Sequence, residues 1–112
     1  MESSPAPRVQ LSVRELAERL KRGDALTIVD VREAEELRIA SFPGALHIPL
    51  ATLPLRLADL PKDRTLVLAC HHGNRSMMAV RFLRAQGRTD VLNLDGGIEA
   101  WARDVDPNVK RY

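Results

Sequence analysis

Apolar positions first recur with the period of an α-helix between residues 12 and 23. The residues that follow the i, i+3, i+4, i+7 spacing of one helix face are Val13, Leu16, Ala17 and Leu20. Ser12 and Glu15 have the spacing of an N-terminal capping box, and Gly23 is typical of a helix end. The pattern predicts an amphipathic helix between Ser12 and Gly23.

Short apolar runs with β-branched residues predict strands. The runs lie within residues 25–30, 42–48, 64–70 and 89–95. The second strand cannot extend past Pro49. The third run, "RTLVLAC", is apolar on both faces, as is typical of a central parallel strand. We therefore expect the strand that ends at Cys70 to lie in the middle of the sheet.

Helical patterns lie between the strands. Residues 32–40 are helix formers, and Asp30 and Glu33 are spaced like another cap. Around residues 53–60, Pro54 suits the first turn of a helix. The inward positions of this second helix would be Leu53, Leu57 and Leu60.

Two more helices follow, over residues 76–87 and 98–105. The core stripe of the first is predicted to be Met78, Ala79, Phe82 and Leu83. Its opposite face would carry Arg81, Arg84 and Arg88, with Met77 near its start. The core stripe of the last helix is predicted to be Ile98, Trp101, Ala102 and Val105.

Strands that alternate with helices predict an α/β fold: a three-layer single domain whose mostly parallel sheet has helices on both faces. The 112 residues suffice for one compact domain. We expect it to span residues 9–112, after a flexible N-terminal tail at residues 1–8. Ligands of such sheets bind at the carboxyl ends of the strands, where Cys70 lies.

Charge and cysteine content narrow the function classes. With 17 basic and 15 acidic residues the net charge is +2, which gives little electrostatic support for nucleic-acid binding. No stretch approaches the roughly 20 apolar residues of a membrane span. The single cysteine cannot form an intrachain disulfide, which fits a reducing compartment. We expect a cytoplasmic protein without membrane or nucleic-acid partners.

The chemistry-bearing residues gather after Cys70, in the string "CHHGNRS". Five residues separate Cys70 from Ser76, where the next helix is expected to begin, so the loop must curl. Gly73 permits an unusual backbone angle, and inward N–H groups with the helix N-terminus would form an anion cradle. Such donors, together with Arg75, favour the nucleophilic thiolate of Cys70.

Two other interpretations of these residues stay open. Cys70 is a buried, inert core residue in the first, as free cysteines usually are. The second is a metal site, formed by Cys70 with His71 and His72 and with His47 as a further ligand. Adjacent residues rarely point at one ion, and no usual ligand spacing is present, so we predict neither metal nor cofactor.

Four segments in order resemble the rhodanese-like sulfurtransferases. "CHHGNRS" resembles their active-site loop, "IVDVRE" their early Asp-x-Arg motif, "FPGALHIP" their Pro-Gly-Ala turn and "LDGGIEAW" their Gly-Gly…Trp signature. The resemblance spans roughly residues 9–104 and implies a five-stranded sheet. The ending "AWARDVDPNVKRY" is similar to the rhodanese domain fused to adenylyltransferases that activate ubiquitin-like sulfur carriers. The chain departs from the family at residues 40–42, where many members have Gly-His-Ile.

The resemblance implies that Cys70 takes a sulfane sulfur from thiosulfate or a persulfide and passes it to cyanide, a thiol or a sulfur-carrier protein. Arg75 would attract a small anionic donor, Gly73 would supply a backbone donor, and Ser76 would cap the helix or bond the loop. The full binding loop would be His71, His72, Gly73, Asn74, Arg75 and Ser76. Asp30 and Arg32 would either orient the loop or form a plain structural ion pair.

Alternative functions also follow from the resemblance. The family includes phosphatases and arsenate reductases, but their loop places five residues between Cys and Arg, whereas four separate Cys70 from Arg75. Other members are non-enzymatic relay or binding modules, typically without the cysteine. If the face of Arg81, Arg84 and Arg88 is more than a solvated surface, it is a hypothetical docking site for an acidic carrier protein.

Overall fold

The structure, a computed structural model, describes residues 8–112. Five parallel strands form one sheet in the order β1-β5-β4-β2-β3. The strands are β1 (Gln10–Leu11), β2 (Leu26–Asp30), β3 (Leu46–His47), β4 (Thr65–Ala69) and β5 (Val91–Leu94). The predicted parallel α/β fold is therefore confirmed. The predicted tail lies outside the described residues, except for Arg8.

The central strand is β4, as predicted, because it pairs with β2 on one side and with β5 on the other. Its side chains alternate between two apolar clusters, as the period of two in a strand requires. Leu66, Leu68 and Cys70 belong to one cluster, and Val67 and Ala69 to the other. This alternation aims Cys70 at one defined layer of the molecule.

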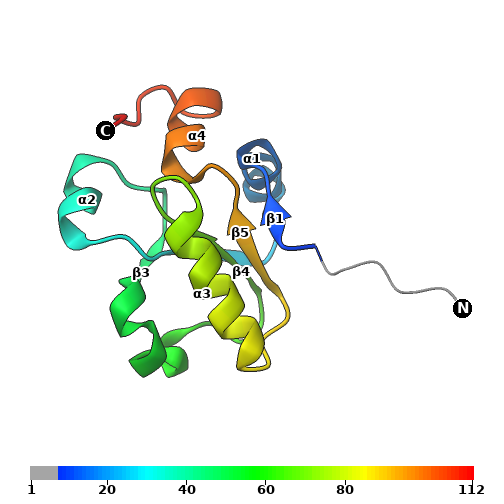
Figure 1. Cartoon of the computed structure of the whole chain (residues 1–112). Helices are drawn as coiled ribbons and strands as arrows, with labels where there is room; N and C mark the ends of the chain where they lie inside the picture. Colours follow the sequence, from blue (N-terminus) through cyan, green and yellow to red (C-terminus); the bar gives the residue numbers. More distant parts are fainter. Residues whose placement is uncertain (1–7) are drawn as a thin grey trace, which may run out of the picture.

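Helices cover both faces of the sheet (Figure 1). α1 (Val13–Arg22) and α4 (Gly97–Asp104) pack together and contribute to the cluster of Val67 and Ala69. α3 (Asn74–Ala85) crosses in front of β4 and β5 in Figure 1 and packs on the Cys70 cluster. α2 (Ala34–Ile39) follows β2.

The two ends predicted for α1 are confirmed, but its predicted core face is only partly buried: Val13 and Leu16 are buried, whereas Leu20 is 37% exposed. Ser12 is the N-cap, with its hydroxyl accepting the Glu15 N–H at 3.1 Å. Gly23 ends the helix in the left-handed conformation at φ 76°. No helix among residues 8–112 is long and apolar enough to cross a membrane.

The prediction of an α-helix around residues 53–60 is wrong. The segment forms two 3₁₀ helices instead, η1 (Leu50–Leu55) and η2 (Leu57–Asp59). Pro54 lies inside η1, where its missing N–H would leave a gap in an α-helical hydrogen-bond ladder. Leu53 and Leu60 are nevertheless buried, as predicted.

The prediction of which α3 residues face the core is also partly wrong. The helix begins at Asn74, not at Ser76, and its buried residues are Ser76, Ala79, Val80 and Leu83. These four residues follow the i, i+3, i+4, i+7 spacing of one helix face. That face lies about one residue position around the helix from the predicted one. Met78 is consequently 60% exposed, while Met77 packs partly against the core.

The predicted basic face of α3 is not a continuous free surface. Arg84 donates to the carbonyl of Val91 at 2.7 Å and to that of Arg8 at 2.8 Å. Arg88 binds Asp90 and the carbonyl of Arg64. These bonds tie the end of the helix to the sheet, which weakens the docking hypothesis.

Candidate active site

Cys70 lies directly after β4, where the chain turns into the loop that precedes α3. It is a free cysteine, and its Sγ accepts the N–H of Gly73 at 3.1 Å and the N–H of Ser76 at 3.4 Å. Gly73 is the N-cap of α3 and has φ 106°, a value that a side chain makes unfavourable. The loop and the first turn of α3 therefore form a cradle of main-chain donors around the sulfur.

The N-terminus of α4 holds the other side of the loop. The N–H groups of Ile98 and Glu99 donate to the carbonyls of Cys70 and His71 at 2.9 and 3.1 Å. These carbonyls face α4, whereas the N–H groups of Gly73 and Ser76 face the sulfur. Gly97 allows this approach, since a Cβ there would lie 2.4 Å from the Cys70 carbonyl oxygen.

Ser76 connects the sulfur to β5. Its hydroxyl lies 3.3 Å from Sγ and 2.5 Å from Oδ1 of Asn93, and it is fully buried. The Asn93 amide in turn donates to the carbonyl of Gly73 at 3.2 Å. A hydroxyl carries one proton, so Ser76 donates either to Asn93 or to a sulfur anion. Ser76 thus contacts the sulfur through both its hydroxyl and its N–H group.

The sulfur is buried as well as cradled. Cys70 is 1% exposed and belongs to an apolar cluster with Leu68 and Val80. Burial alone fits an inert core cysteine. The two N–H groups aimed at Sγ do not, because an inert thiol needs no converging donors.

Asp30 and Arg32 form a fully buried, bidentate ion pair. Nη2 and Nε of Arg32 lie 2.7 and 3.0 Å from the Asp30 carboxylate oxygens. Arg32 also donates to the carbonyl of Ala40 at 2.9 Å. Asp30 is therefore not the predicted helix cap: Glu33 is the N-cap of α2 and forms its capping box with Glu36. These contacts join β2 to the end of α2.

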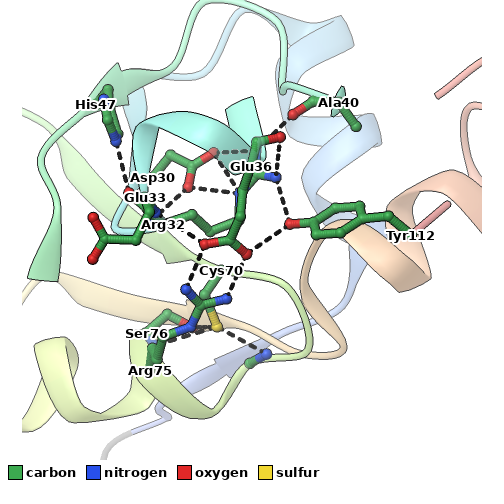
Figure 2. Close-up of polar contacts among 11 residues, drawn as sticks. Asp30, Arg32, Glu33, Glu36, Ala40, His47, Cys70, Arg75, Ser76 and Tyr112 are labelled. Carbon is green, nitrogen blue, oxygen red and sulfur yellow. Dashed lines mark hydrogen bonds and ion pairs between the residues drawn. The ribbon is translucent and has the colours of Figure 1, made fainter. Parts of the chain in front are cut away.

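Arg75 lies at the loop but is held by a carboxylate (Figure 2). Its Nη1 and Nη2 donate to the two oxygens of Glu36 at 2.7 and 2.9 Å. The hydrogen bonds from Arg75 lower the pKa of Glu36 to about 2, and the same pairing raises the pKa of Arg75. The group that was predicted to attract an anionic donor is thus paired within the chain.

Tyr112 joins this network from the C-terminal segment. Its hydroxyl donates to Glu36 at 2.9 Å and accepts from Arg32 at 2.8 Å. Its ring stacks on His71 with 3.8 Å between centroids, and His71 stacks on His72 at 3.9 Å. Burial lowers the pKa of His71 and favours its neutral form.

The histidines do not form the metal site considered above. Nε2 of His47 lies 2.7 Å from the carbonyl oxygen of Arg32. Among residues 8–112, no group of three or more His, Cys, Asp or Glu side chains is placed to hold a metal ion. A shallow hollow of about 530 Å³ lies beside the loop and is lined by His72, Glu99, Arg111 and Tyr112.

Four residues of the site were not among the predicted ones: Glu36, Asn93, Gly97 and Tyr112. Gly97 lies in the "LDGG" string, which was noted only for its resemblance. For Asn93, a lone polar residue within an apolar strand was the available signal. Glu36 and Tyr112 carried no local signal, because one lies on an ordinary charged helix and the other in an irregular segment.

Comparison with known proteins gives the class to which this site belongs. Residues 12–104 match the family model of the rhodanese-like domain. The chain resembles a rhodanese-related protein from Thermoplasma volcanium in structure, with a TM-score of 0.80, 33% identity and coverage of 93% of this chain and 99% of that one. The chain therefore belongs to the rhodanese-like family.

Relatives in sequence point to sulfur transfer. The chain is 39% identical to a protein of Allochromatium vinosum named "Sulfurtransferase", over 89% of this chain and 94% of that one. It is 38% identical to the Mycobacterium tuberculosis "Probable adenylyltransferase/sulfurtransferase MoeZ", over 91% of this chain but only 26% of that protein. These relatives support a transferase that moves sulfur, and the family resemblance seen in the sequence is confirmed.

Proposed function

We propose that the protein transfers sulfane sulfur through a persulfide on Cys70. The observation that carries this proposal is the pair of N–H groups, of Gly73 and Ser76, that converge on Sγ at the start of α3. Main-chain donors at a helix N-terminus stabilise a sulfur anion, which is both the attacking form of cysteine and the charged end of a persulfide. The donor is thiosulfate or a persulfide, and no cofactor takes part.

The cycle has two displacements. The Cys70 thiolate attacks the outer sulfur of the donor, the donor's S–S bond breaks, and sulfite or a thiolate leaves with the bonding electron pair. The acceptor then attacks the outer sulfur of the Cys70 persulfide, and the Cys70 thiolate is restored. Neither step needs an oxidant or a reductant, because each exchanges one bond to sulfur for another.

Access to the sulfur requires a small opening of the loop, since Cys70 is 1% exposed.

The acceptor is a thiol, cyanide or a sulfur-carrier protein. Support for a carrier comes from MoeZ, whose name joins a sulfurtransferase to an adenylyltransferase. His71, His72 and Asn74 form the outer part of the loop that the donor and acceptor meet.

The test is intact-mass measurement after incubation with thiosulfate or with a low-molecular-weight persulfide. We expect the mass to increase by one sulfur atom, and cyanide or dithiothreitol to remove that atom. The matched control, Cys70→Ser, keeps the shape of the site without the nucleophile and should gain no sulfur. A wild-type protein that gains no sulfur from either donor would overturn the proposal. A phosphate-ester hydrolysis assay on the same sample should show no activity.

A further inference from the structure

The positive charges around the Cys70 loop are paired with carboxylates of the same chain. In the described part of the chain these pairs are Asp30 with Arg32, Glu36 with Arg75, and Glu99 with Arg111. Burial lowers the pKa of His71, which favours its neutral form. A donor that approaches the loop therefore meets main-chain dipoles rather than a free cation.

The pair of Arg75 and Glu36 is the one next to the loop, because Arg75 lies in the first turn of α3. Both carboxylate oxygens of Glu36 accept from Arg75, and the Tyr112 hydroxyl holds the same carboxylate in place. The side chain of Glu36 is 19% exposed, so solvent screens the pair only in part. Figure 2 shows this carboxylate between the Arg75 guanidinium and the Tyr112 ring.

We infer that Glu36 sets donor specificity: by neutralising Arg75, it removes the electrostatic advantage that the doubly charged thiosulfate would otherwise have over a singly charged persulfide. This inference rests on the proposed function and names the donor class of the same site. An unpaired Arg75 would attract a dianion about twice as strongly as a monoanion at the same distance. With Glu36 in place, this electrostatic preference for thiosulfate is removed.

Glu36→Gln tests the inference, because glutamine keeps the shape and one acceptor oxygen but removes the charge. The probes are thiosulfate and the persulfide of 2-mercaptoethanol, which carries at most one negative charge. We expect kcat/KM to rise roughly tenfold for thiosulfate and roughly threefold for the persulfide. These values assume that one unpaired positive charge in a solvated site attracts the dianion about twice as strongly as the monoanion. The ratio of the two constants should thus shift about threefold toward thiosulfate.

Ionic strength supplies a second readout that a merely structural role of Glu36 would not change. In Glu36→Gln, kcat/KM for thiosulfate should fall more steeply with added salt than in the wild type, because an unpaired cation is screened. Persulfide turnover and the thermal unfolding curve of the variant report whether it is folded.

The matched control is Glu35→Gln, which removes the same charge from an exposed neighbouring position of α2. Its donor ratio should equal that of the wild type.

If the wild type takes sulfur from the persulfide but the donor ratio of folded Glu36→Gln equals that of the wild type, the inference is overturned and the proposed function stands. If Glu35→Gln shifts the ratio as much as Glu36→Gln, net charge rather than the Arg75 pair is responsible, and the inference is overturned. If the wild type takes sulfur from neither donor, the proposed function itself fails.

Discussion

At the scale of single residues, the site is defined by what its polar groups contact. The Cys70 sulfur accepts two main-chain N–H groups and lies against the Ser76 hydroxyl. Arg75, for which the family resemblance implies donor binding, has both Nη atoms on Glu36. The sequence shows which residue types are present, but the partner of Arg75 lies 39 residues away and carries no signal of its own.

Arg75→Ala should weaken the use of thiosulfate more than the use of a persulfide. The substitution leaves the Glu36 carboxylate unpaired beside the loop, and that negative charge repels a dianion more than a monoanion. We expect kcat/KM to fall roughly tenfold for thiosulfate and roughly threefold for a persulfide. Steady-state rates with both donors measure this, and equal losses would remove Arg75 and Glu36 from donor recognition.

Ser76→Ala should destabilise the protein and slow sulfur uptake. The buried Asn93 Oδ1 would lose its hydroxyl donor, which costs about 1–3 kcal/mol for an unsatisfied buried acceptor. Urea unfolding measures the free-energy change, and Ser76→Cys offers a comparison that keeps a weak donor at the same position. An unchanged free energy of unfolding in Ser76→Ala would show that the contact with Asn93 contributes nothing.

At the scale of elements, the loop is shaped by helices from both layers. α3 begins in the loop and supplies the Ser76 N–H to the sulfur, whereas α4 supplies two N–H groups to the loop carbonyls. Gly97 makes the second arrangement sterically allowed. The N-termini of α3 and α4 therefore form the cradle together at the carboxyl end of β4.

Gly97→Ala should abolish sulfur uptake even where the protein remains folded. Its Cβ would lie 2.4 Å from the Cys70 carbonyl oxygen and 2.5 Å from that of His71, so the loop must shift. Gly23→Ala is the matched control: Gly23 also has a positive φ, 76°, but nothing lies within 4 Å of its Cβ position. The control should lose about 1–2 kcal/mol of stability from backbone strain and keep its activity. Equal sulfur uptake by the two folded variants would contradict the role given to α4.

Elements with local signals were predicted from the sequence, and those formed by distant pairing were not. Ser12, Gly23 and the apolar run before Cys70 fixed α1 and β4, because caps and two-faced hydrophobicity are local properties. The expected fifth strand, β1, was not located by the hydrophobic pattern, since its two residues have no pattern and become a strand only by pairing with β5. The 3₁₀ segments were missed because their leucine spacing also fits an α-helix.

At the scale of the whole molecule, the C-terminal segment packs beside the site. Val109 and Tyr112 pack against the apolar cluster that contains α1 and α4, and Tyr112 contacts Glu36 from 76 residues away in the sequence. The network therefore ties β2, α2, the loop and the C-terminal segment together. No local pattern predicts such a contact, because it depends on the complete fold.

This network gives the stability a predictable pH dependence. The pKa of Glu36 is lowered from 4.5 to about 2, so its contribution is fully present above pH 4.5 and is lost as the pH falls through about 2. Because Arg75 is partly exposed, we expect only about 1–2 kcal/mol from the pair. Urea unfolding should show Glu36→Gln less stable than the wild type at neutral pH, with the two converging below pH 4.5. A difference that stays constant down to pH 2 would contradict the ionised pair.

A crystal structure of the sulfur-loaded protein tests most directly whether the loop holds a persulfide on Cys70. We predict one extra sulfur bonded to Sγ of Cys70 and enclosed by the loop, within about 3.5 Å of main-chain nitrogens of residues 71–76. An extra sulfur that points away from the loop, with no main-chain N–H in reach, would contradict it.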